Sequence, residues 1–303
     1  MGAVSVAIEI KGLKKSYGDF EAVRGIDLSV SEGEVFAFLG PNGAGKTTTV
    51  EILEGYRERT AGEVEVLGID PTRGNRSWRE RIGIVLQDCR MEPLLTVRET
   101  LSLYAGYYDA PRDVEETIGL VGLEGKADER AGRLSGGQQR RLDVAVALIG
   151  DAELLFLDEP TTGFDPSARR QAWDVIASLR DLGKTVFLTT HYMDEAQFLA
   201  DRVAIIRDGR IVAEGKPSEL GGRAEAASKI TFLWPEGKEL PTHAGAVSRD
   251  KGFVEITTTE PTRALRDLTT WAMDQGTELT GLSVSQPSLE DVFLELTSEV
   301  DDA

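Results

Sequence analysis

The sequence has little that belongs to a secreted or membrane-spanning protein. Its single cysteine, Cys89, excludes an intramolecular disulfide and fits a reducing compartment. The longest uninterrupted apolar run, residues 144–149, is far shorter than the roughly 18 residues that a membrane-spanning helix needs. No basic segment followed by an apolar stretch begins the chain, so no secretory signal is predicted. We therefore expect a cytoplasmic protein.

Acidic residues outnumber basic residues in this sequence. The 303 residues include 34 Lys and Arg against 52 Asp and Glu, and the formal net charge of −18 repels a phosphodiester backbone. We therefore expect no nucleic-acid partner. Residues 224–303, with 6 basic and 15 acidic side chains, carry half of this excess charge in about a quarter of the chain. This shift in composition predicts a domain boundary near residue 223.

Short apolar runs alternate with helical patterns in the first part of the chain, and no internal repeat is present. Residues 154–157 are apolar on both faces, as expected of a central strand in a covered parallel sheet. Strands are predicted at 4–10, 26–30, 35–39, 63–66, 82–86, 154–157, 186–190, 203–206 and 211–213. Helices are predicted at 46–53, 97–108, 113–121, 136–148, 166–180 and 194–200. This order predicts an α/β fold with some added antiparallel strands.

A second, smaller unit is predicted beyond the Pro- and Gly-containing segment 215–227. Its pattern predicts strands at 230–233, 253–258 and 279–284 and helices at 262–273 and 289–296. In the last helix an apolar stripe recurs at helical spacing, at Leu289, Val292, Phe293 and Leu296. Ser288 can cap this helix, with Asp291 completing an approximate capping box. A small α+β domain is expected.

A glycine-rich segment at residues 40–47 fits the pattern G-x-x-x-x-G-K-[ST] between a predicted strand and a predicted helix. Backbone N–H groups of such a loop surround phosphates, and the helix N-terminus adds a positive dipole end. Lys46 supplies a full charge for the β- and γ-phosphates, and the Thr47 hydroxyl can bind Mg²⁺. The predicted nucleotide contacts here are Gly40, Pro41, Asn42, Gly43, Ala44, Gly45, Lys46, Thr47 and Thr48.

Two adjacent carboxylates, Asp158 and Glu159, follow the apolar strand at 154–157. Side chains alternate as a strand ends, so the two carboxylates can serve different roles. Asp158 suits the Mg²⁺ shell, and Glu159 suits the orientation of a water molecule that attacks the γ-phosphate.

A second anion-binding helix start is predicted at Leu134-Ser135-Gly136-Gly137-Gln138. One nucleotide has one triphosphate tail, so a second phosphate cradle is unusual in a chain that works alone. It is explained if Ser135, Gly136, Gly137 and Gln138 contact the nucleotide held by another copy of the chain.

These three motifs, in their order along the chain (40–47, 134–138, then 158–159), resemble those of the ATP-binding subunit of ABC transporters, and the resemblance covers about residues 4–220. The resemblance implies a P-loop NTPase ABC cassette in residues 1–222, with a mixed-sheet core and a helical subdomain at about 88–150. Residues 223–303 then form a small C-terminal α+β accessory domain. It also implies ATP and Mg²⁺ as ligands, a homodimer with two shared ATP sites, and catalysis by Glu159, His191 and Lys46.

Four further positions match the family's pattern. Tyr17 corresponds to the aromatic residue that stacks on adenine. Gln87 corresponds to the glutamine that touches Mg²⁺ and links the site to the membrane partner. Asp165 corresponds to the aspartate of the loop that crosses the dimer interface. His191 corresponds to the histidine that contacts the γ-phosphate.

The segment 287–294 resembles the end of the antibiotic and multidrug exporter group, which includes the daunorubicin-resistance ATPase. That group pairs the ATPase with a separately encoded membrane permease, which implies a peripheral position on the inner face of the cell membrane. Non-transport relatives with two cassettes, long coiled coils or zinc-binding cysteine clusters do not fit one cassette and one cysteine. A regulatory ATPase that acts as an interaction module stays open as the alternative.

Overall fold

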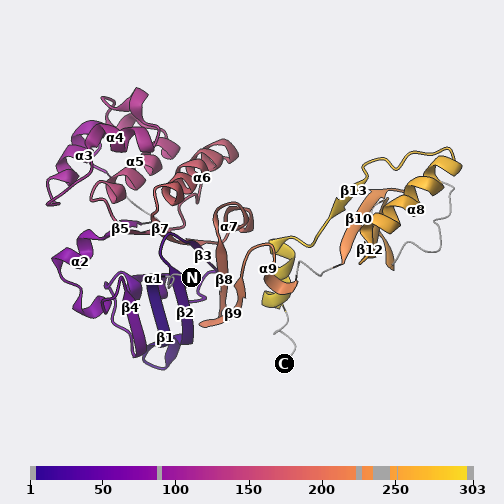
Figure 1. Ribbon diagram of the computed structural model, residues 1–303, viewed down its shortest axis with the longest axis horizontal. Coiled ribbons are helices and arrows are strands. Elements are labelled where there is room, and N and C mark those ends of the chain that lie inside the picture. The colour runs from indigo at the N-terminus through magenta and orange to yellow at the C-terminus, as the bar shows by residue number, and fades with distance from the viewer. Residues whose placement is uncertain (1–4, 87–90, 223–226, 235–245, 251, 299–303) are drawn as a thin grey trace. The chain divides into compact units, whose positions relative to one another are not determined.

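A six-stranded mixed sheet forms the centre of the first part of the chain in the computed structural model (Figure 1). Neighbouring strands follow in the order β5 (Ile82–Val85), β6 (Leu154–Asp158), β7 (Thr185–Thr190), β3 (Val35–Leu39), β8 (Arg202–Arg207) and β9 (Arg210–Gly215). The first five strands are parallel, and β9 pairs antiparallel with β8. Every residue of β3 and β7 is buried, which confirms the prediction of a parallel sheet covered on both faces.

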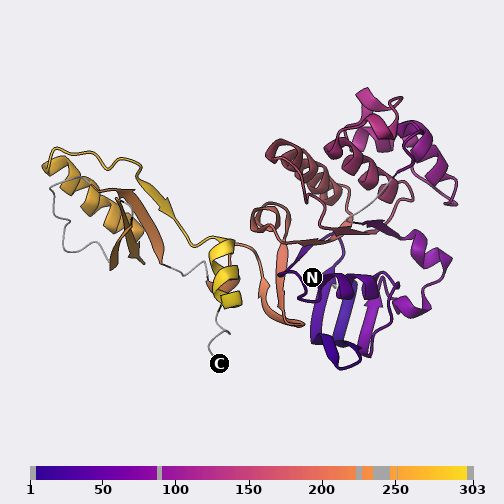
Figure 2. The same cartoon turned by 180° about the vertical axis from the view of Figure 1, so that it is seen from behind.

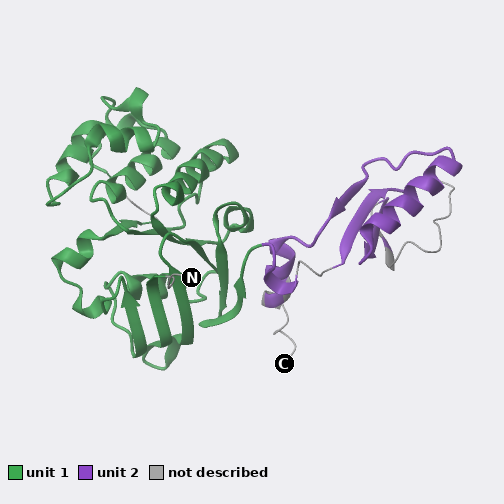
Figure 3. Cartoon of the chain, viewed as in Figure 1, with its two compact units in different colours: residues 1–217 green, residues 218–303 purple. Residues whose placement is uncertain are grey.

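The structure describes residues 5–86, 91–222, 227–234, 246–250 and 252–298. The chain divides into two units, Met1–Pro217 and Ser218–Ala303, shown in Figure 3. This division lies a few residues before the boundary expected after residue 222. Among the described residues, no helix combines the length and the apolar character needed to cross a bilayer.

A three-stranded antiparallel sheet packs beside the central sheet, in the order β2 (Phe20–Ser31), β1 (Val6–Tyr17) and β4 (Ala61–Val66). Its buried side chains share one core with Phe36, Phe38 and Phe156 of the central sheet. The predicted strands at 4–10 and 26–30 were too short, because β1 and β2 each run for 12 residues. A register shift near Gly12, whose φ is +58°, breaks the period-two pattern that sequence reasoning relies on.

Helices surround the central sheet, and three of them form a group of their own. These three are α3 (Val97–Ala105), α4 (Val114–Leu120) and α5 (Gly136–Leu148), which contact one another. In both views they lie on the side of the sheet away from β1, β2 and β4 (Figures 1 and 2). They occupy the region in which the helical subdomain was predicted.

The remaining helices of the first unit connect the strands. They are α1 (Lys46–Leu53), α2 (Arg76–Glu80), α6 (Pro166–Asp181), α7 (Met193–Leu199) and the short 3₁₀ helices η1 (Pro71–Arg73), η2 (Glu124–Lys126) and η3 (Ala131–Arg133). The bounds of α1 and α5 match the prediction residue for residue. Helix α2 was missed because it is only five residues long, although Asn75 caps it by accepting from the Trp78 N–H at 2.9 Å.

The second unit is built on an antiparallel sheet in the order β11 (Ala246–Asp250), β12 (Phe253–Thr258), β10 (Ser228–Leu233) and β13 (Ser283–Ser285). Helix α8 (Pro261–Asp274) contributes Ala264 and Leu268 to a core with Ile230 and Val254. The predicted α+β character is confirmed. The strand predicted at 279–284 was largely wrong, because a turn at Gly281 delays pairing until Ser283.

The C-terminal helix α9 (Leu289–Ser298) packs inside the second unit against the short 3₁₀ helix η4 (Leu220–Gly222). Leu289 and Val292 of the predicted apolar stripe are buried, and Val292 lies against Gly221. The predicted cap is confirmed, since the Asp291 N–H donates to Ser288 Oγ at 3.0 Å. The apolar stripe therefore has a partner within its own unit.

We predict that a chain ending at Pro217 folds and binds ATP, because every predicted ATP-contacting residue precedes residue 192 and lies in the first unit. Thermal unfolding and titration with a fluorescent ATP analogue measure the two properties. The full-length chain is the control. A truncated chain that folds yet binds no nucleotide contradicts this division.

Candidate functional site

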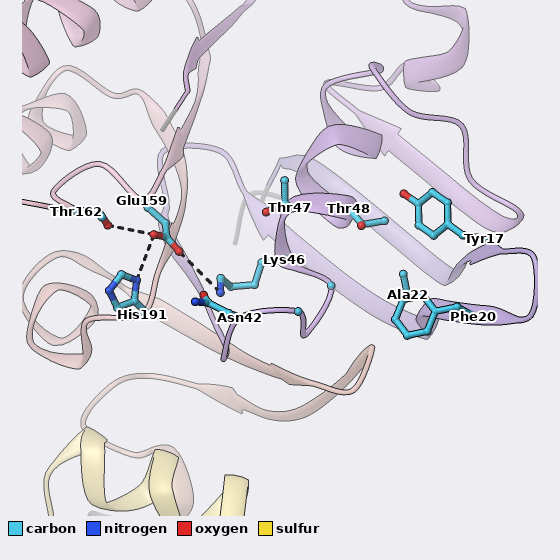
Figure 4. A pocket seen from close by; sticks show the side chains of 12 residues that line it. Tyr17, Phe20, Ala22, Asn42, Lys46, Thr47, Thr48, Glu159, Thr162 and His191 are labelled. Carbon is cyan, nitrogen blue, oxygen red and sulfur yellow. Dashed lines mark hydrogen bonds and ion pairs between the residues drawn. The ribbon is translucent and has the colours of Figure 1, made fainter. Parts of the chain in front are cut away.

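The parallel pairing of three central strands brings three loops to one edge of the sheet. In the sheet register Leu39 of β3 lies beside Thr190 of β7, and Asp158 of β6 lies beside Thr189. The segments that follow these strands therefore emerge together, as expected at the carboxyl edge of a parallel sheet. They are the Gly-rich loop after β3, the segment that begins with Glu159 after β6, and the segment that begins with His191 after β7 (Figure 4).

A cavity of about 600 Å³ opens at this edge. It is lined by Tyr17, Phe20, Ala22, Asn42, Gly43, Gly45, Lys46, Thr47, Thr48, Glu159, Thr162 and His191 (Figure 4). Most of the residues predicted around the phosphates thus share one space. Gln87 lies outside the described residues.

The backbone of the Gly-rich loop leaves no room for side chains at two of its glycines. A Cβ on Gly40 would lie 2.4 Å from the carbonyl oxygen of Ile206. Gly45 has a φ of +107°, and a Cβ there would lie 2.6 Å from the carbonyl oxygen of Ala22. Among the described residues, no side chain caps the helix that starts after Gly45, so an anion can take that position. The loop therefore fits a phosphate group.

Lys46 is a buried cation within this loop. Its side chain is 6% exposed, and Nζ donates to the carbonyl oxygens of Gly40 at 2.7 Å and Pro41 at 3.2 Å. Burial lowers the pKa of Lys46 below its usual value, while the carboxylates of Glu159 and Asp158 act in the opposite direction. The positive charge is thus held at the bottom of the cavity, where it can attract a polyphosphate.

Glu159 lies between two cavity residues. Its Oε1 is 4.0 Å from Lys46 Nζ, its Oε2 is 3.3 Å from His191 Nδ1, and Oε2 accepts from the Thr162 hydroxyl at 3.1 Å. Thr189 fixes the backbone, since its carbonyl and hydroxyl oxygens each lie 3.1 Å from the Glu159 N–H. A carboxylate held in this way can orient a water molecule within the cavity.

The donors predicted for Mg²⁺ are a hydroxyl and a carboxylate. Thr47 lines the cavity, and Asp158 ends the strand beside it, accepting a hydrogen bond from the Thr189 hydroxyl. Among the described residues, no cluster of three or more His, Cys, Asp or Glu side chains could hold a metal by itself. A site with few protein oxygen donors suits Mg²⁺, because phosphate oxygens and water can fill the remaining coordination positions of the ion.

Aromatic residues form the outer rim of the cavity. Tyr17 is 40% exposed, and its ring centroid is 5.0 Å from Lys15 Nζ and 5.3 Å from Arg57 Cζ. Phe20 also lines the cavity and was not predicted. The sequence held a signal for it, because the Gly-Asp pair between Tyr17 and Phe20 favours a tight hairpin turn. In such a turn Tyr17 pairs with Phe20, as the structure shows.

The predicted signature residues stand apart from the cavity of the same chain. Ser135 caps α5, since its N–H donates to Gln138 Oε1 at 3.0 Å and its Oγ accepts from the Gln138 N–H at 3.4 Å. Asp165 caps α6 by accepting from the N–H groups of Ser167 and Ala168. None of the described residues 135–138 or 165 is among those that line the cavity. One chain alone does not bring the two predicted phosphate cradles together.

A second cavity of about 560 Å³ lies in the same unit, and sequence reasoning gave no signal for it. Glu54, Trp78, Tyr104 and Tyr108 are among the residues that line it. Glu54 is only 8% exposed, and burial, with smaller contributions from the carboxylates of Asp158 and Glu51, raises its pKa to about 8. At neutral pH this side chain is therefore largely a neutral carboxylic acid.

Comparisons with known proteins agree with this geometry. Residues 23–162 match the family described as "ABC transporter", and residues 228–288 match "ABC transporter domain-containing protein-like, C-terminal domain". The chain is 39% identical to the Nod factor export ATP-binding protein I of Rhizobium etli, over 96% of this chain and 93% of that protein. It is 37% identical to the daunorubicin resistance ATP-binding protein DrrA3 of Streptomyces coeruleorubidus, over 97% and 96%.

A solved structure is similar to the first unit. It is a dimeric ATP-binding cassette in a post-hydrolysis state bound to ADP and phosphate. The TM-score is 0.61 at 28% sequence identity, over 69% of this chain and 98% of that one. The predicted fold class, an α/β cassette with an additional C-terminal domain, is confirmed.

We predict that Glu54→Gln stabilises the protein increasingly as the pH rises from about 5 to 8. Over this range the folded parent keeps the Glu54 proton that the unfolded chain releases. Its free energy of unfolding therefore falls by about 1.4 kcal/mol per pH unit from this group, whereas glutamine does not titrate. Denaturant unfolding of both proteins at several pH values measures the gap. A gap that does not change with pH contradicts the prediction.

Proposed function

The chain is an ATP-hydrolysing member of the ABC transporter family, and we propose that it powers export through a separate membrane protein. The names of its relatives support export of a small molecule, since one is a Nod factor export protein and another a daunorubicin resistance protein. The single structural observation that carries the ATP-driven part of this proposal is the position of Glu159 between Lys46 and His191 at the phosphate loop.

ATP would lie with its triphosphate in the loop 40–47 and its adenine against Tyr17 at the rim. Lys46 then faces the β- and γ-phosphates, and Phe20 adds apolar surface near the base. Thr47 and Asp158 would hold Mg²⁺, which neutralises phosphate charge when bound. The lowered pKa of Lys46 does not prevent this, because a bound polyphosphate favours its protonated form.

Hydrolysis would proceed by attack of water on the γ-phosphorus with cleavage of its bond to the bridging oxygen, giving ADP and inorganic phosphate, and the proton lost by the water would pass to solvent directly or by way of Glu159. Glu159 orients the water and accepts its hydrogen bond, since Oε1 and Oε2 both face the cavity side chains. His191, 3.3 Å from Glu159, can hydrogen-bond to the γ-phosphate and hold the carboxylate in place. Thr162 donates to the same carboxylate oxygen.

Two copies of the chain would complete the site. The residues 135–138 start a capped helix away from the cavity of their own chain, which supports their use by the nucleotide of another copy. A Cβ on Gly137 would come within 3.2 Å of Ala168, three residues after Asp165, so both predicted interface segments lie on neighbouring surface. We therefore propose two ATP molecules, each between the Lys46 loop of one chain and the Ser135 segment of the other.

The membrane protein would dock at the second cavity. Strand β5 lines this cavity with Ile82 and Ile84 and ends two residues before Gln87, the position proposed to link the ATP site to the partner. The neutral acid of Glu54 and the aromatic rings of Tyr104 and Tyr108 suit a segment that is partly apolar and partly polar. The chain would then lie on the inner face of the cell membrane through this partner.

We predict that Glu159→Gln lowers ATP turnover by about 10²- to 10⁴-fold, the range typical of losing a general base. ATP binding should persist, because Lys46 and the loop remain, and an ATP-bound dimer should accumulate on a sizing column. Phosphate release and nucleotide titration measure the two effects.

Glu153→Gln is a matched control, since Glu153 precedes the same strand at its other end and pairs with Arg81. It should leave turnover near that of the parent. Near-parental hydrolysis in Glu159→Gln contradicts the proposed function.

A further inference from the structure

Arg140 has a buried guanidinium that contacts the segment 158–160, which contains Glu159. Arg140 belongs to helix α5, less than two turns after the Ser135 cap, and is 7% exposed. Burying such a charge costs free energy unless its donors find acceptors. The geometry of those acceptors indicates what the residue does.

Among the described residues, Arg140 donates hydrogen bonds to three backbone carbonyl groups. Its Nε donates to Pro160 at 3.0 Å, its Nη2 to Asp158 at 2.9 Å, and its Nη1 to Leu86. Asp143, one turn further along α5, lies 3.6 Å from Nη1 and supplies the countercharge. The planar fork of a guanidinium fixes the relative positions of its acceptors.

Two of these carbonyl groups flank Glu159, which has an unfavourable backbone conformation. Its φ is +44°, in the left-handed region that costs a residue with a side chain about 1–2 kcal/mol. Such a conformation persists only when the surroundings impose it. Thr189 holds the Glu159 N–H, and Arg140 holds the carbonyl groups of Asp158 and Pro160, the residues on either side of Glu159.

We propose that Arg140 is a positioning residue that holds the Glu159 carboxylate in its hydrolytic orientation. This inference rests on the proposed function, in which Glu159 orients the attacking water. Without the guanidinium, the carbonyl groups of Asp158 and Pro160 lose their hydrogen-bond donor, so Glu159 can leave the left-handed conformation and its carboxylate moves with the backbone. The third contact, to Leu86, ties the residue before Gln87 to the same side chain.

The test compares three variants of the full-length chain. Arg140→Gln removes the fork, and Arg140→Lys keeps the charge but reaches fewer carbonyl groups. Arg141→Gln is the matched control, because the adjacent Arg141 donates to the carbonyl oxygens of Val121 and Gly122, away from Glu159. Turnover, the ATP concentration at half-maximal turnover, ATP affinity and thermal unfolding are measured for each.

Arg140→Gln should lower turnover by about 10- to 100-fold, the size expected of a small misplacement of a reacting group. ATP affinity should stay within about twofold of the parent, since Arg140 does not line the cavity. Arg140→Lys should recover part of the loss, and Arg141→Gln should retain parental turnover. Parental turnover in Arg140→Gln, or equal losses in both glutamine variants, overturns the proposal.

A double variant separates positioning from general destabilisation. If Arg140 acts through Glu159, adding Arg140→Gln to Glu159→Gln should not reduce the residual rate further. The same 10- to 100-fold loss in both backgrounds contradicts the proposal. If Arg140→Gln does not fold, the same comparison is made with Arg140→Lys. Near-parental turnover in Glu159→Gln alone overturns the proposed function itself, whereas impaired Glu159→Gln with unimpaired Arg140→Gln overturns only the role of Arg140.

Discussion

The parallel register of β3, β7 and β6 is the constraint on which the rest of the site depends. Because Leu39 pairs with Thr190 and Thr189 with Asp158, three loops that are distant in the sequence begin at one level of the sheet. The buried side chains of these strands leave no freedom for a shift by one residue, which would exchange their two faces. The distances among Lys46, Glu159 and His191 follow from this register.

Electrostatics at the site run against the charge of the whole molecule. A chain with a net charge of −18 repels a polyphosphate at long range, yet the loop offers a buried ammonium, backbone N–H groups and a helix N-terminus. Glu159 lines the same cavity and Asp158 ends the strand beside it, so both carboxylates would repel phosphate if Lys46 were absent. The guanidinium of Arg140 adds a positive charge near these carboxylates, and it donates to the backbone carbonyl groups of Asp158 and Pro160, on either side of Glu159.

Local signals explain which parts could be predicted from the sequence. Helices α1 and α5 were predicted residue for residue because Gly45 and Ser135 mark their starts, and the loop pattern located Lys46 and Thr47. Arg140 was missed because its role depends on carbonyl groups 18 to 54 residues away, which leave no local pattern. Glu54 was missed for the same reason, since its raised pKa comes from burial by distant elements. Strand β11, five residues with weak alternation, gave no distinct signal.

The most direct test of the shared ATP site mixes two inactive chains, one carrying Lys46→Ala and the other Ser135→Arg. Each homodimer has two damaged sites, whereas the heterodimer combines both changes in one site and leaves the other intact. With free exchange of subunits, the mixture should regain about a quarter of the parental ATPase activity, since half of the dimers are mixed and each holds one working site. No recovery in a mixture that demonstrably contains heterodimers contradicts the account.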